Sequence, residues 1–479
     1  MTNTLTVNGR DYAWPQCPTV VVCVDGSEPD YIEQAVAAGA TPFMAEMLQR
    51  GADLRVDSVV PSFTNPNNIS IVTGVPPAVH GICGNYFLDP NTGAEVMMND
   101  PAFLRCGTIH AAFHGAGARV AVVTAKDKLR ALLGHGLDMT SGRAVCFSSE
   151  KADQATLEVN GITDVLALVR QVLPSVYSAA LSEFVLAAGV KLLERQPWDL
   201  MYLSTTDYIQ HKHAPGTPEA NAFYAMMDGY LARLDALGAT IALTADHGMK
   251  AKHDATGQPN VIYLQTVLDD LFGPGRTRVI LPITDPYVVH HGALGSFARI
   301  YVQDGRDVDA VAARLRQLAG ILAVLDRVDG CARFGLPLDR EGDLIVISTH
   351  EQTLGTRIEQ HDLSQLKHPL RSHGGITEQR VPLLLNRPVD NRIASATLRN
   401  FDAFYLALNR GSPASLATGR PNVAGAPTGR RDCVAFSTPA GTEVPAHNAP
   451  QPYICSVLSG EGKAATSDGK RPCAWVPES

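Results

Sequence analysis

Five segments of the sequence carry residues of the kinds that bind transition metals or attack an electrophile. The residues are Asp25, Thr64, Asp207, His211, Asp246, His247 and His373. Carboxylate oxygens and imidazole nitrogens are ligands of zinc and similar divalent ions. A threonine hydroxyl is a poor nucleophile, but its pKa falls when it coordinates such an ion. The set therefore predicts a metal site that activates a hydroxyl.

Asp207 and His211 stand four positions apart in TTDYIQHKH. If this segment turns helical, both side chains project from one face and a single metal ion can take both. His373, in HPLRSHGG, is the candidate third ligand and would leave a position open for substrate. On its own, an Asp-x-x-x-His pair is more often a pair on a helix surface than a metal site.

Asp25 and Asp246 each follow an apolar run, in VVVCVDG and in TIALTADHG. His247 is adjacent to the second carboxylate, and Gly248 lets the backbone turn sharply and approach a ligand. Acid and imidazole could both reach a metal there. Taken alone, Asp25 favours an Asx-turn or a helix cap, and the Asp-His-Gly segment fits a capped turn equally well.

Thr64 lies in PSFTNPNNISIVTG, where Pro66 indicates the first turn of a helix. Backbone N–H groups and the helix dipole would then face a phosphoryl group placed beside the hydroxyl. A metal on the hydroxyl would supply the alkoxide, and a second metal about 4 Å away could hold the leaving side of an in-line displacement. Without the other segments, Thr64 is more often a simple helix cap.

The elements that must position these residues alternate between strands and helices from Thr19 to about Gly248. Runs rich in Val, Ile and Leu predict buried strands of a mostly parallel sheet, at residues 19–26, 119–125, 199–205 and 240–248. Cap and stop signals predict helices from Thr41-Pro42 to Gly51 and from Thr217-Pro218 to Gly238. Ligands of such α/β sheets bind beyond the carboxyl ends of the strands, which is where we expect Asp25, Lys126, Asp207 and Asp246.

The pattern divides the chain into three regions. Residues 1–250 and 367–410 predict an α/β core, which resumes at SHGG (372–375) and ends in a strand at 381–386 and a helix at about 394–409. Residues 251–366 predict a smaller inserted α+β cap, from FARIYV (297–302), the helical pattern at 307–320 and GDLIVIS (342–348). Residues 411–479 are rich in Pro, Gly, Ala, Ser and Thr, and we expect them to be disordered.

Five motifs occur in a characteristic order along the chain. They are VDG at 24–26, T-N-P-N-N at 64–68, T-D-Y-x-x-H at 206–211, A-D-H-G-M at 245–249 and H-G-G at 373–375. As a set they resemble the alkaline phosphatase superfamily, especially its nucleotide pyrophosphatase/phosphodiesterase branch, over about residues 17–410. The resemblance implies an alkaline phosphatase-like core: a mostly parallel central sheet flanked by helices, with the inserted cap beside it.

The same resemblance implies two Zn²⁺ per chain and a role for each of the seven residues. One zinc would be held by Asp25, Thr64, Asp246 and His247, and the other by Asp207, His211 and His373. Thr64 would be the nucleophile, placed between metal and phosphorus. Mn²⁺ and Fe²⁺ share these oxygen and nitrogen ligands, so the sequence leaves the physiological metal open.

Five further residues are candidate substrate contacts. Asn85, in HGICGNYF, resembles the family asparagine that donates hydrogen bonds to a phosphoryl oxygen, although a turn asparagine fits equally. If the strand at 119–125 extends through KDK, its period of two places Lys126 and Lys128 on one side, where they could bind a small dianion. A solvated charged loop is the more usual role of such lysines. His290 and His291, in DPYVVHHGALG, could contact substrate from the edge of the cap or simply occupy a loop.

The resemblance and the two lysines together imply hydrolysis of the carbon–phosphorus bond of phosphonoacetate to acetate and phosphate. The departing carbon would carry negative charge that delocalises into its carboxylate, so cations there stabilise the transition state. One alternative is hydrolysis of nucleotide or other phosphodiesters or phosphomonoesters, with Phe63, Tyr86 or Phe113 available for an aromatic slot. A second alternative is a phosphate-transferring mutase with the same core, although such proteins usually have serine at the nucleophile position, where this chain has Thr64. A third is a non-catalytic metal-binding protein.

Composition narrows the range of partners. The net charge of −8 argues against a broad nucleic-acid surface, and no apolar run approaches the roughly 20 residues that span a bilayer. The amino terminus lacks the basic start and apolar stretch of a secretion signal, and the nine scattered cysteines indicate reduced thiols. We therefore expect a cytoplasmic protein that binds a small phosphonate, without nucleic-acid or membrane partners. The oligomeric state stays open, with a homodimer as one option.

Overall fold

A seven-stranded sheet with the order β4-β19-β10-β3-β9-β7-β8 forms the centre of the protein. The computed structural model describes residues 4–283, 293–364, 366–390 and 397–410. The strands of this sheet are β3 (Thr19–Cys23), β4 (Ala52–Asp57), β7 (Val120–Thr124), β8 (Ala144–Ser148), β9 (Leu200–Ser204), β10 (Thr240–Thr244) and β19 (Arg380–Leu385). β10, β3, β9, β7 and β8 are parallel, whereas β19 runs antiparallel to both β10 and β4. The predicted mostly parallel sheet is confirmed.

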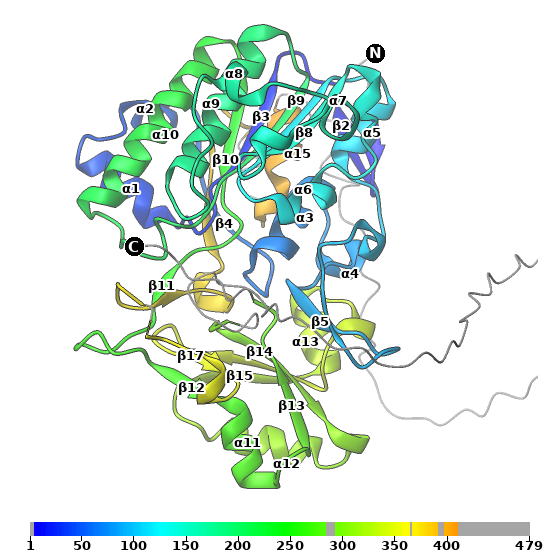
Figure 1. Ribbon diagram of the computed structural model, residues 1–479, viewed down its shortest axis with the longest axis vertical. Coiled ribbons are helices and arrows are strands. Elements are labelled where there is room, and N and C mark those ends of the chain that lie inside the picture. The colour runs from blue at the N-terminus through cyan, green and yellow to red at the C-terminus, as the bar shows by residue number, and fades with distance from the viewer. Residues whose placement is uncertain (1–3, 284–292, 365, 391–396, 411–479) are drawn as a thin grey trace, which may run out of the picture. The chain divides into compact units, whose positions relative to one another are not determined.

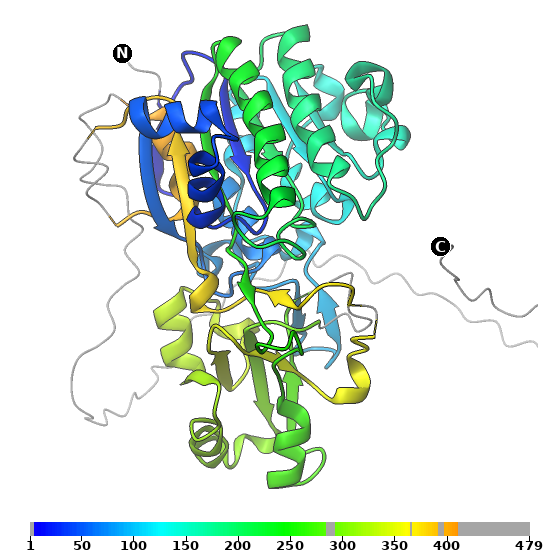
Figure 2. The same ribbon diagram turned by 90° about the vertical axis from the view of Figure 1, so that its left-hand side faces the viewer.

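The parallel strands are hydrophobic on both faces because helices cover both (Figures 1 and 2). In β3, Val20 and Val22 belong to one hydrophobic core, and Val21 and Cys23 to another on the opposite face. The helices that contribute to the Val20 core are α1 (Pro29–Ala37), α2 (Pro42–Arg50), α8 (Val165–Val169), α9 (Ala180–Arg195) and α10 (Pro218–Ala236). The Val21 core takes side chains from α3 (Thr64–Thr73), α5 (Ile109–Gly115), α6 (Asp127–Leu133) and α15 (Ala403–Leu408), and it continues into residues 264–354.

The predicted starts of two helices are confirmed, although the Thr41 hydroxyl makes no cap hydrogen bond at the first of them. α2 begins at Pro42 and α10 at Pro218, each with proline in the first turn. The Thr217 hydroxyl accepts a hydrogen bond from the Ala220 N–H and so satisfies one of the free donors at the start of α10.

A second, four-stranded antiparallel sheet lies in the predicted α+β segment. Its order is β13-β14-β16-β15, made of β13 (Thr277–Ile280), β14 (Phe297–Val302), β16 (Leu344–Ser348) and β15 (Ile321–Asp326). The accompanying helices are α11 (Leu264–Phe272), α12 (Val308–Leu315) and α13 (Arg327–Phe334). The limits of the predicted cap subdomain, residues 251 and 366, stay a prediction, because side chains of this segment and of the central sheet belong to one hydrophobic core.

Four short two-stranded sheets accompany these two sheets among the described residues. They are β1 (Thr4–Val7) with β2 (Arg10–Ala13), β5 (Tyr86–Leu88) with β6 (Glu95–Met97), β11 (Lys250–Ala251) with β18 (Arg371–Ser372), and β12 (Val261–Tyr263) with β17 (Thr353–Gly355). The remaining short helices are α4 (Pro77–His80), α7 (Leu157–Asn160), η1 (Pro101–Phe103), η2 (Met139–Ser141), η3 (Ala152–Gln154), η4 (Gln303–Gly305), η5 (Leu338–Arg340), η6 (Ile358–Gln360), η7 (Ile376–Glu378) and η8 (Asn400–Asp402). The β11–β18 pair matters most, because it joins the segment after His247 to the segment before His373.

Two predicted elements differ in the structure. β7 ends at Thr124, and α6 begins at Asp127, so the strand does not extend through Lys126 and Lys128. Of the predicted last helix at 394–409, residues 394–396 lie outside the described residues, and α15 spans only Ala403–Leu408, after the short 3-10 helix η8. His290, His291 and the predicted tail 411–479 lie outside the described residues. Across the parts of the chain that the structure describes, no helix has the length and apolar character needed to cross a membrane.

Candidate active site and metal centres

Four chain segments bring the predicted residues to the carboxyl ends of the parallel strands. Asp25 follows β3, Asp207 follows β9 and Asp246 follows β10, while Thr64 is the first residue of α3. A parallel sheet places all such ends at one edge, which is where ligands bind in α/β folds. The predicted convergence is therefore confirmed for these residues.

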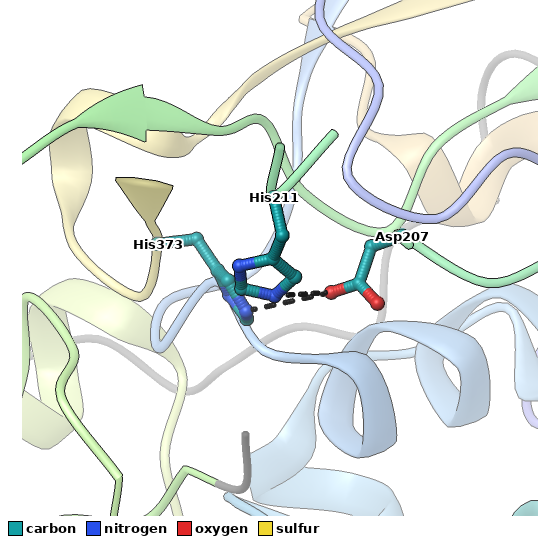
Figure 3. Close-up of side chains that lie close together, drawn as sticks. All are labelled: Asp207, His211 and His373. Carbon is teal, nitrogen blue, oxygen red and sulfur yellow. Dashed lines mark ion pairs between the residues drawn. The ribbon is translucent and has the colours of Figure 1, made fainter. Parts of the chain in front are cut away.

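Asp207, His211 and His373 form one candidate metal centre (Figure 3). Their ligand atoms lie within 4.8 Å of one another. The His211 Nε2 is 2.9 Å from the Asp207 Oδ2, and the His373 Nε2 is 4.0 Å from the same oxygen. The segment between the first two residues forms a turn rather than the helix that the spacing predicts, with the His211 N–H donating to the Asp207 carbonyl at 3.0 Å. That single bond is enough to bring both side chains to one side.

Asp25, Asp207 and His247 form a second group whose ligand atoms also lie within 4.8 Å of one another. The His247 Nε2 is 3.2 Å from the Asp25 Oδ1, and both atoms are buried without a hydrogen-bond partner. Buried polar atoms normally have such a partner. A buried imidazole nitrogen and a buried carboxylate oxygen that lie this close together without hydrogen-bond partners fit the ligand set of a divalent cation. Because Asp207 belongs to both groups, the two centres are adjacent.

The three histidines are held by backbone carbonyls. The contacts of their Nδ1 atoms are His211 with the Arg371 carbonyl (3.0 Å), His247 with the Gly248 carbonyl (2.9 Å) and His373 with the Ser62 carbonyl (2.8 Å). A carbonyl only accepts, so each Nδ1 carries a proton, and Nε2 is the nitrogen of each ring that is left to bind a metal ion. Metal-binding histidines are commonly oriented by such a contact. The rings of His247 and His373 stack, with centroids 3.6 Å apart.

The charges of this cluster also favour a bound cation. Burial, and next the charge of Asp25, raise the pKa of Asp246 well above its usual range. Burial alone would lower the pKa of His247, but Asp246 and Asp25 raise it to about 10. Carboxylates crowded together in a buried site repel each other unless positive charge lies between them. A divalent ion would supply that charge.

Asp246 is held by groups that the sequence did not single out. Its Oδ1 accepts from the Gly26 N–H at 3.2 Å, and its Oδ2 accepts from the Asn68 Nδ2 at 3.1 Å. The Asn68 Oδ1 in turn accepts from the hydroxyls of Tyr202 (2.7 Å) and Ser204 (2.9 Å). Asn68 lies inside the T-N-P-N-N motif, which was the available signal for it.

A buried ion pair connects the two loops that carry His247 and His373. The Glu378 carboxylate accepts from the Lys252 Nζ and from the Gly375 N–H, both at 2.9 Å. The Glu378 carbonyl accepts from the Gly248 N–H at 2.7 Å. Both side chains of the pair are fully buried. No local sequence pattern marks Glu378, because its partners lie far away along the chain.

Thr64 opens onto a pocket beside the two centres. The pocket is lined by Asp25, Thr64, Thr124, Lys126, Lys128, Leu129, Ser204, Thr205 and Asp207. Both lysines reach it by a different route from the one predicted: Lys126 immediately precedes α6 and Lys128 lies in its first turn. Burial, and next the charge of Lys126, lower the pKa of Lys128 to about 8. Two cations and the Thr64 hydroxyl thus share one small space.

Asn85, which immediately precedes β5, contacts the first turn of α3 beside Thr64. Its Oδ1 accepts from the Asn65 N–H at 3.3 Å, and the residue is buried. An amide whose oxygen is fixed in this way has a fixed orientation, so its Nδ2 has a defined direction. Its predicted role as a donor to a phosphoryl oxygen stays a prediction.

Residues 19–376 match the family described as type I phosphodiesterase / nucleotide pyrophosphatase. The chain belongs to this family. Among solved structures, the phosphonoacetate hydrolase of Sinorhizobium meliloti 1021, determined in complex with phosphonoacetate and with phosphonoformate, is 59% identical with a TM-score of 0.83. The alignment covers 86% of this chain and 99% of that chain.

Two further matches are less similar to this chain. An uncharacterized pyrophosphatase/phosphodiesterase of Schizosaccharomyces pombe is 36% identical over 89 residues, which are 18% of this chain and 17% of that protein. The match thus spans about a sixth of that curated relative. The structure of alkaline phosphatase PafA is 16% identical with a TM-score of 0.56, covering 83% of this chain and 96% of that chain, and shows the shared fold. The predicted alkaline phosphatase-like fold of this phosphodiesterase family member is confirmed.

Proposed function

We propose that the chain hydrolyses the carbon–phosphorus bond of phosphonoacetate to acetate and phosphate. The observation that carries this proposal is the pocket in which the Thr64 hydroxyl, Lys126 and Lys128 lie together at the edge of two candidate metal centres. The 59% identity with a phosphonoacetate hydrolase determined with phosphonoacetate bound supports it independently.

Two divalent ions, zinc in the first instance, would be held by the seven predicted residues. Asp25, Thr64, Asp246 and His247 would bind one ion, and Asp207, His211 and His373 the other. The ions would lower the pKa of the attacking hydroxyl and neutralise charge on the phosphoryl oxygens. Structural zinc sites usually have four protein ligands, so the three-residue centre leaves a position for substrate.

Thr64 would attack phosphorus through Oγ1, and the bond from phosphorus to carbon would break. Because Thr64 begins α3, the positive end of the helix dipole would face a phosphoryl group placed there. The electron pair of the broken bond passes to the carbon and delocalises into the substrate carboxylate, where Lys126 and Lys128 would stabilise it. The carbon takes a proton to give acetate, and water then releases phosphate from the threonine.

The nucleotide phosphodiesterase alternative has less support from the described residues. Phe63 is buried against Phe297, and Phe113 is buried beside Trp14. Tyr86 is also buried and does not line the pocket, whose described lining contains no aromatic ring. A nucleotide base would therefore lack the stacking surface that the sequence left open.

A phosphate-release panel tests the proposal. Zinc-loaded protein is given phosphonoacetate, other phosphonates, an aryl phosphomonoester and a nucleotide diester. We expect phosphonoacetate to have the highest kcat/KM. A nucleotide diester cleaved rapidly beside inert phosphonoacetate would replace the proposal with the phosphodiesterase alternative. Fully metal-loaded protein without activity on any of them would support a metal-binding role instead.

A further inference from the structure

Arg299 is the largest fully buried side chain among the described residues, and it lies outside the pocket. It is in the middle of β14, in the second sheet. Its Nε and Nη2 donate to both oxygens of the Glu341 carboxylate, at 2.6 and 2.7 Å. Two further bonds of the guanidinium reach outside the second sheet: Nη1 donates to the Tyr86 carbonyl and Nη2 to the Cys83 carbonyl, each at 2.8 Å.

These two carbonyls flank Asn85. The Asn85 N–H donates to the Pro282 carbonyl at 3.0 Å, and the Asn85 carbonyl accepts from the Met98 N–H at 2.8 Å. Gly84 lacks the side chain that would obstruct this arrangement, since a Cβ there would lie 2.8 Å from Pro282 Cβ and 3.2 Å from the Arg299 Nη1. The guanidinium therefore fixes the Asn85 loop from both sides.

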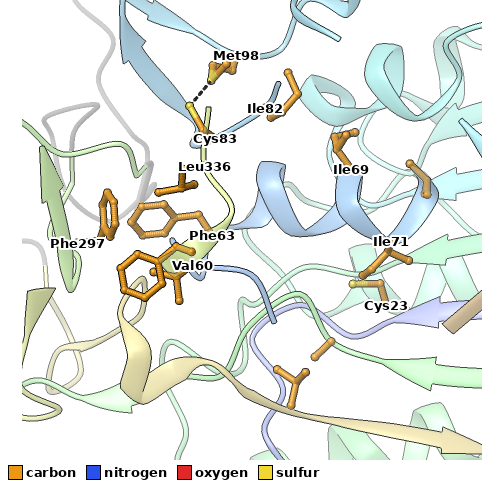
Figure 4. Close-up of a cluster of buried hydrophobic side chains, with 14 of the residues drawn as sticks. Cys23, Val60, Phe63, Ile69, Ile71, Ile82, Cys83, Met98, Phe297 and Leu336 are labelled. Atoms are coloured by element: carbon orange, nitrogen blue, oxygen red, sulfur yellow. Dashed lines mark hydrogen bonds between the residues drawn. The ribbon is translucent and has the colours of Figure 1, made fainter. Parts of the chain in front are cut away.

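The same strand also supports the start of α3. Phe297, two positions before Arg299, packs edge to face against Phe63 with ring centroids 6.3 Å apart (Figure 4). Residues two apart on a strand face the same side. Phe63 directly precedes Thr64, so one face of β14 contacts both the nucleophile's helix and the Asn85 loop.

A buried ion pair is weak evidence of stabilisation, because apolar residues of similar size often serve as well. A planar guanidinium differs in what it can orient: five donors in a rigid fork, here divided between one carboxylate and two carbonyls. A lysine ammonium at this position could not make all four bonds in this geometry. We therefore explain the Arg299–Glu341 pair by the groups that the guanidinium orients rather than by a gain in the stability of the fold.

We propose that Arg299, held by Glu341, is a positioning residue that sets Asn85 relative to Thr64. This proposal rests on the proposed function in one respect, namely that Asn85 donates to a phosphoryl oxygen of the substrate. Arg299 itself touches no reacting atom. Its effect on turnover must therefore pass through Asn85.

A double-mutant cycle with Asn85→Ala and Arg299→Lys tests this dependence. Loss of one preorganised donor lowers kcat by roughly 10²–10³-fold, which we expect for Asn85→Ala. Displacement of the loop by Arg299→Lys should lower kcat by about 10–100-fold, with KM changed much less. In the double variant the second substitution should add no further loss beyond about twofold. Losses that multiply would overturn the proposal.

Arg278→Lys is the matched control. Arg278 also bonds to the β5–β6 hairpin, through the Gly93 carbonyl and Glu95, but at the end away from Asn85. It should leave kcat unchanged, and a loss equal to that of Arg299→Lys would also overturn the proposal. If Arg299→Lys does not fold, Glu341→Gln replaces it in the cycle, with a smaller loss expected that is again absent in the Asn85→Ala background.

The cycle is run on whichever phosphoryl substrate the wild-type protein turns over fastest. If that substrate is not phosphonoacetate, the proposed function fails while the cycle still decides the role of Arg299. If phosphonoacetate is turned over and the losses multiply, only the role of Arg299 fails.

Discussion

At the scale of single residues, the Thr64 hydroxyl is separable from the metal centres. Six other side chains are assigned to the two ions, so Thr64→Ala should keep both metals and the fold. Without the nucleophile, kcat on phosphonoacetate should fall by at least about 10³-fold. Metal analysis of the purified variant alongside phosphate release checks both parts. Loss of the metals together with activity would show that Thr64 matters as a ligand more than as a nucleophile.

Lys126 and Lys128 should distinguish substrates by their carboxylate. Replacing both by Ala removes charge-assisted bonds worth roughly 1.5–3 kcal/mol each, so kcat/KM for phosphonoacetate should fall by at least about 10²-fold. An aryl phosphomonoester has no such carboxylate and should lose far less. Lys151→Ala is the control, because this exposed lysine pairs with Asp127 beside the pocket without lining it. Equal losses for the two substrates would remove the carboxylate role.

The sequence predicted the residues with reactive side chains and missed those that act through the backbone. Asp25, Asp207 and Asp246 follow apolar strands, and that position alone placed them at one edge of the sheet. Glu378 and Arg299 work by contacts with distant carbonyls and N–H groups, for which local sequence contains no pattern. The lysine pair was placed correctly in the pocket for an incorrect reason, because α6 begins where a continuing strand was expected.

At the scale of elements, α3 is a buried helix with many polar side chains. Asn68 links it to Asp246, Tyr202 and Ser204. Asn68→Ala should destabilise the protein by about 2–4 kcal/mol, because it leaves several buried groups without a partner. Urea unfolding of the variant measures this. A change below about 0.5 kcal/mol would mean that the network contributes little to holding Asp246.

Two buried histidines in α4 and α5 should make the fold sensitive to acid. Burial lowers the pKa of His80 to about 3 and that of His110 to about 4. Both are neutral in the fold, whereas the unfolded chain takes up protons near pH 6.5, so stability is lost as the pH falls below 6.5. At pH 5 the loss is up to about 4 kcal/mol for the pair. Replacing both by Gln should flatten the dependence between pH 7 and 5, and an unchanged slope would contradict these shifts.

Strong elements were predictable because their signals are local. The strands of continuous Val, Ile and Leu and the Thr-Pro helix starts appear where the sequence places them. The antiparallel direction of β19 and the pairing of β11 with β18 depend on contacts across more than a hundred residues. Such pairings follow from the packing of the whole chain, so no window of sequence contains them.

At the scale of the whole molecule, the metal centres join segments from Asp25 to His373 and should couple metal binding to stability. A metal ion at a free concentration of 100 times its Kd adds about 2.7 kcal/mol to the free energy of unfolding, so a chelator should lower Tm. Asp25→Asn should lower Tm far more in zinc than in chelator. In zinc it removes a ligand, whereas in chelator it removes both the repulsion with Asp246 and the attraction to His247, which oppose each other. Scanning calorimetry measures both shifts of Tm, and equal shifts with zinc and with chelator would contradict the role of Asp25 as a ligand.

The most direct test of the whole account is the simultaneous measurement of phosphate and acetate from phosphonoacetate. Zinc-loaded wild-type protein should release the two products in equal amounts, and metal-replete Thr64→Ala should release neither at a comparable rate. The account would be contradicted if the wild-type protein released no phosphate from phosphonoacetate, or if metal-replete Thr64→Ala released both products as fast as wild type.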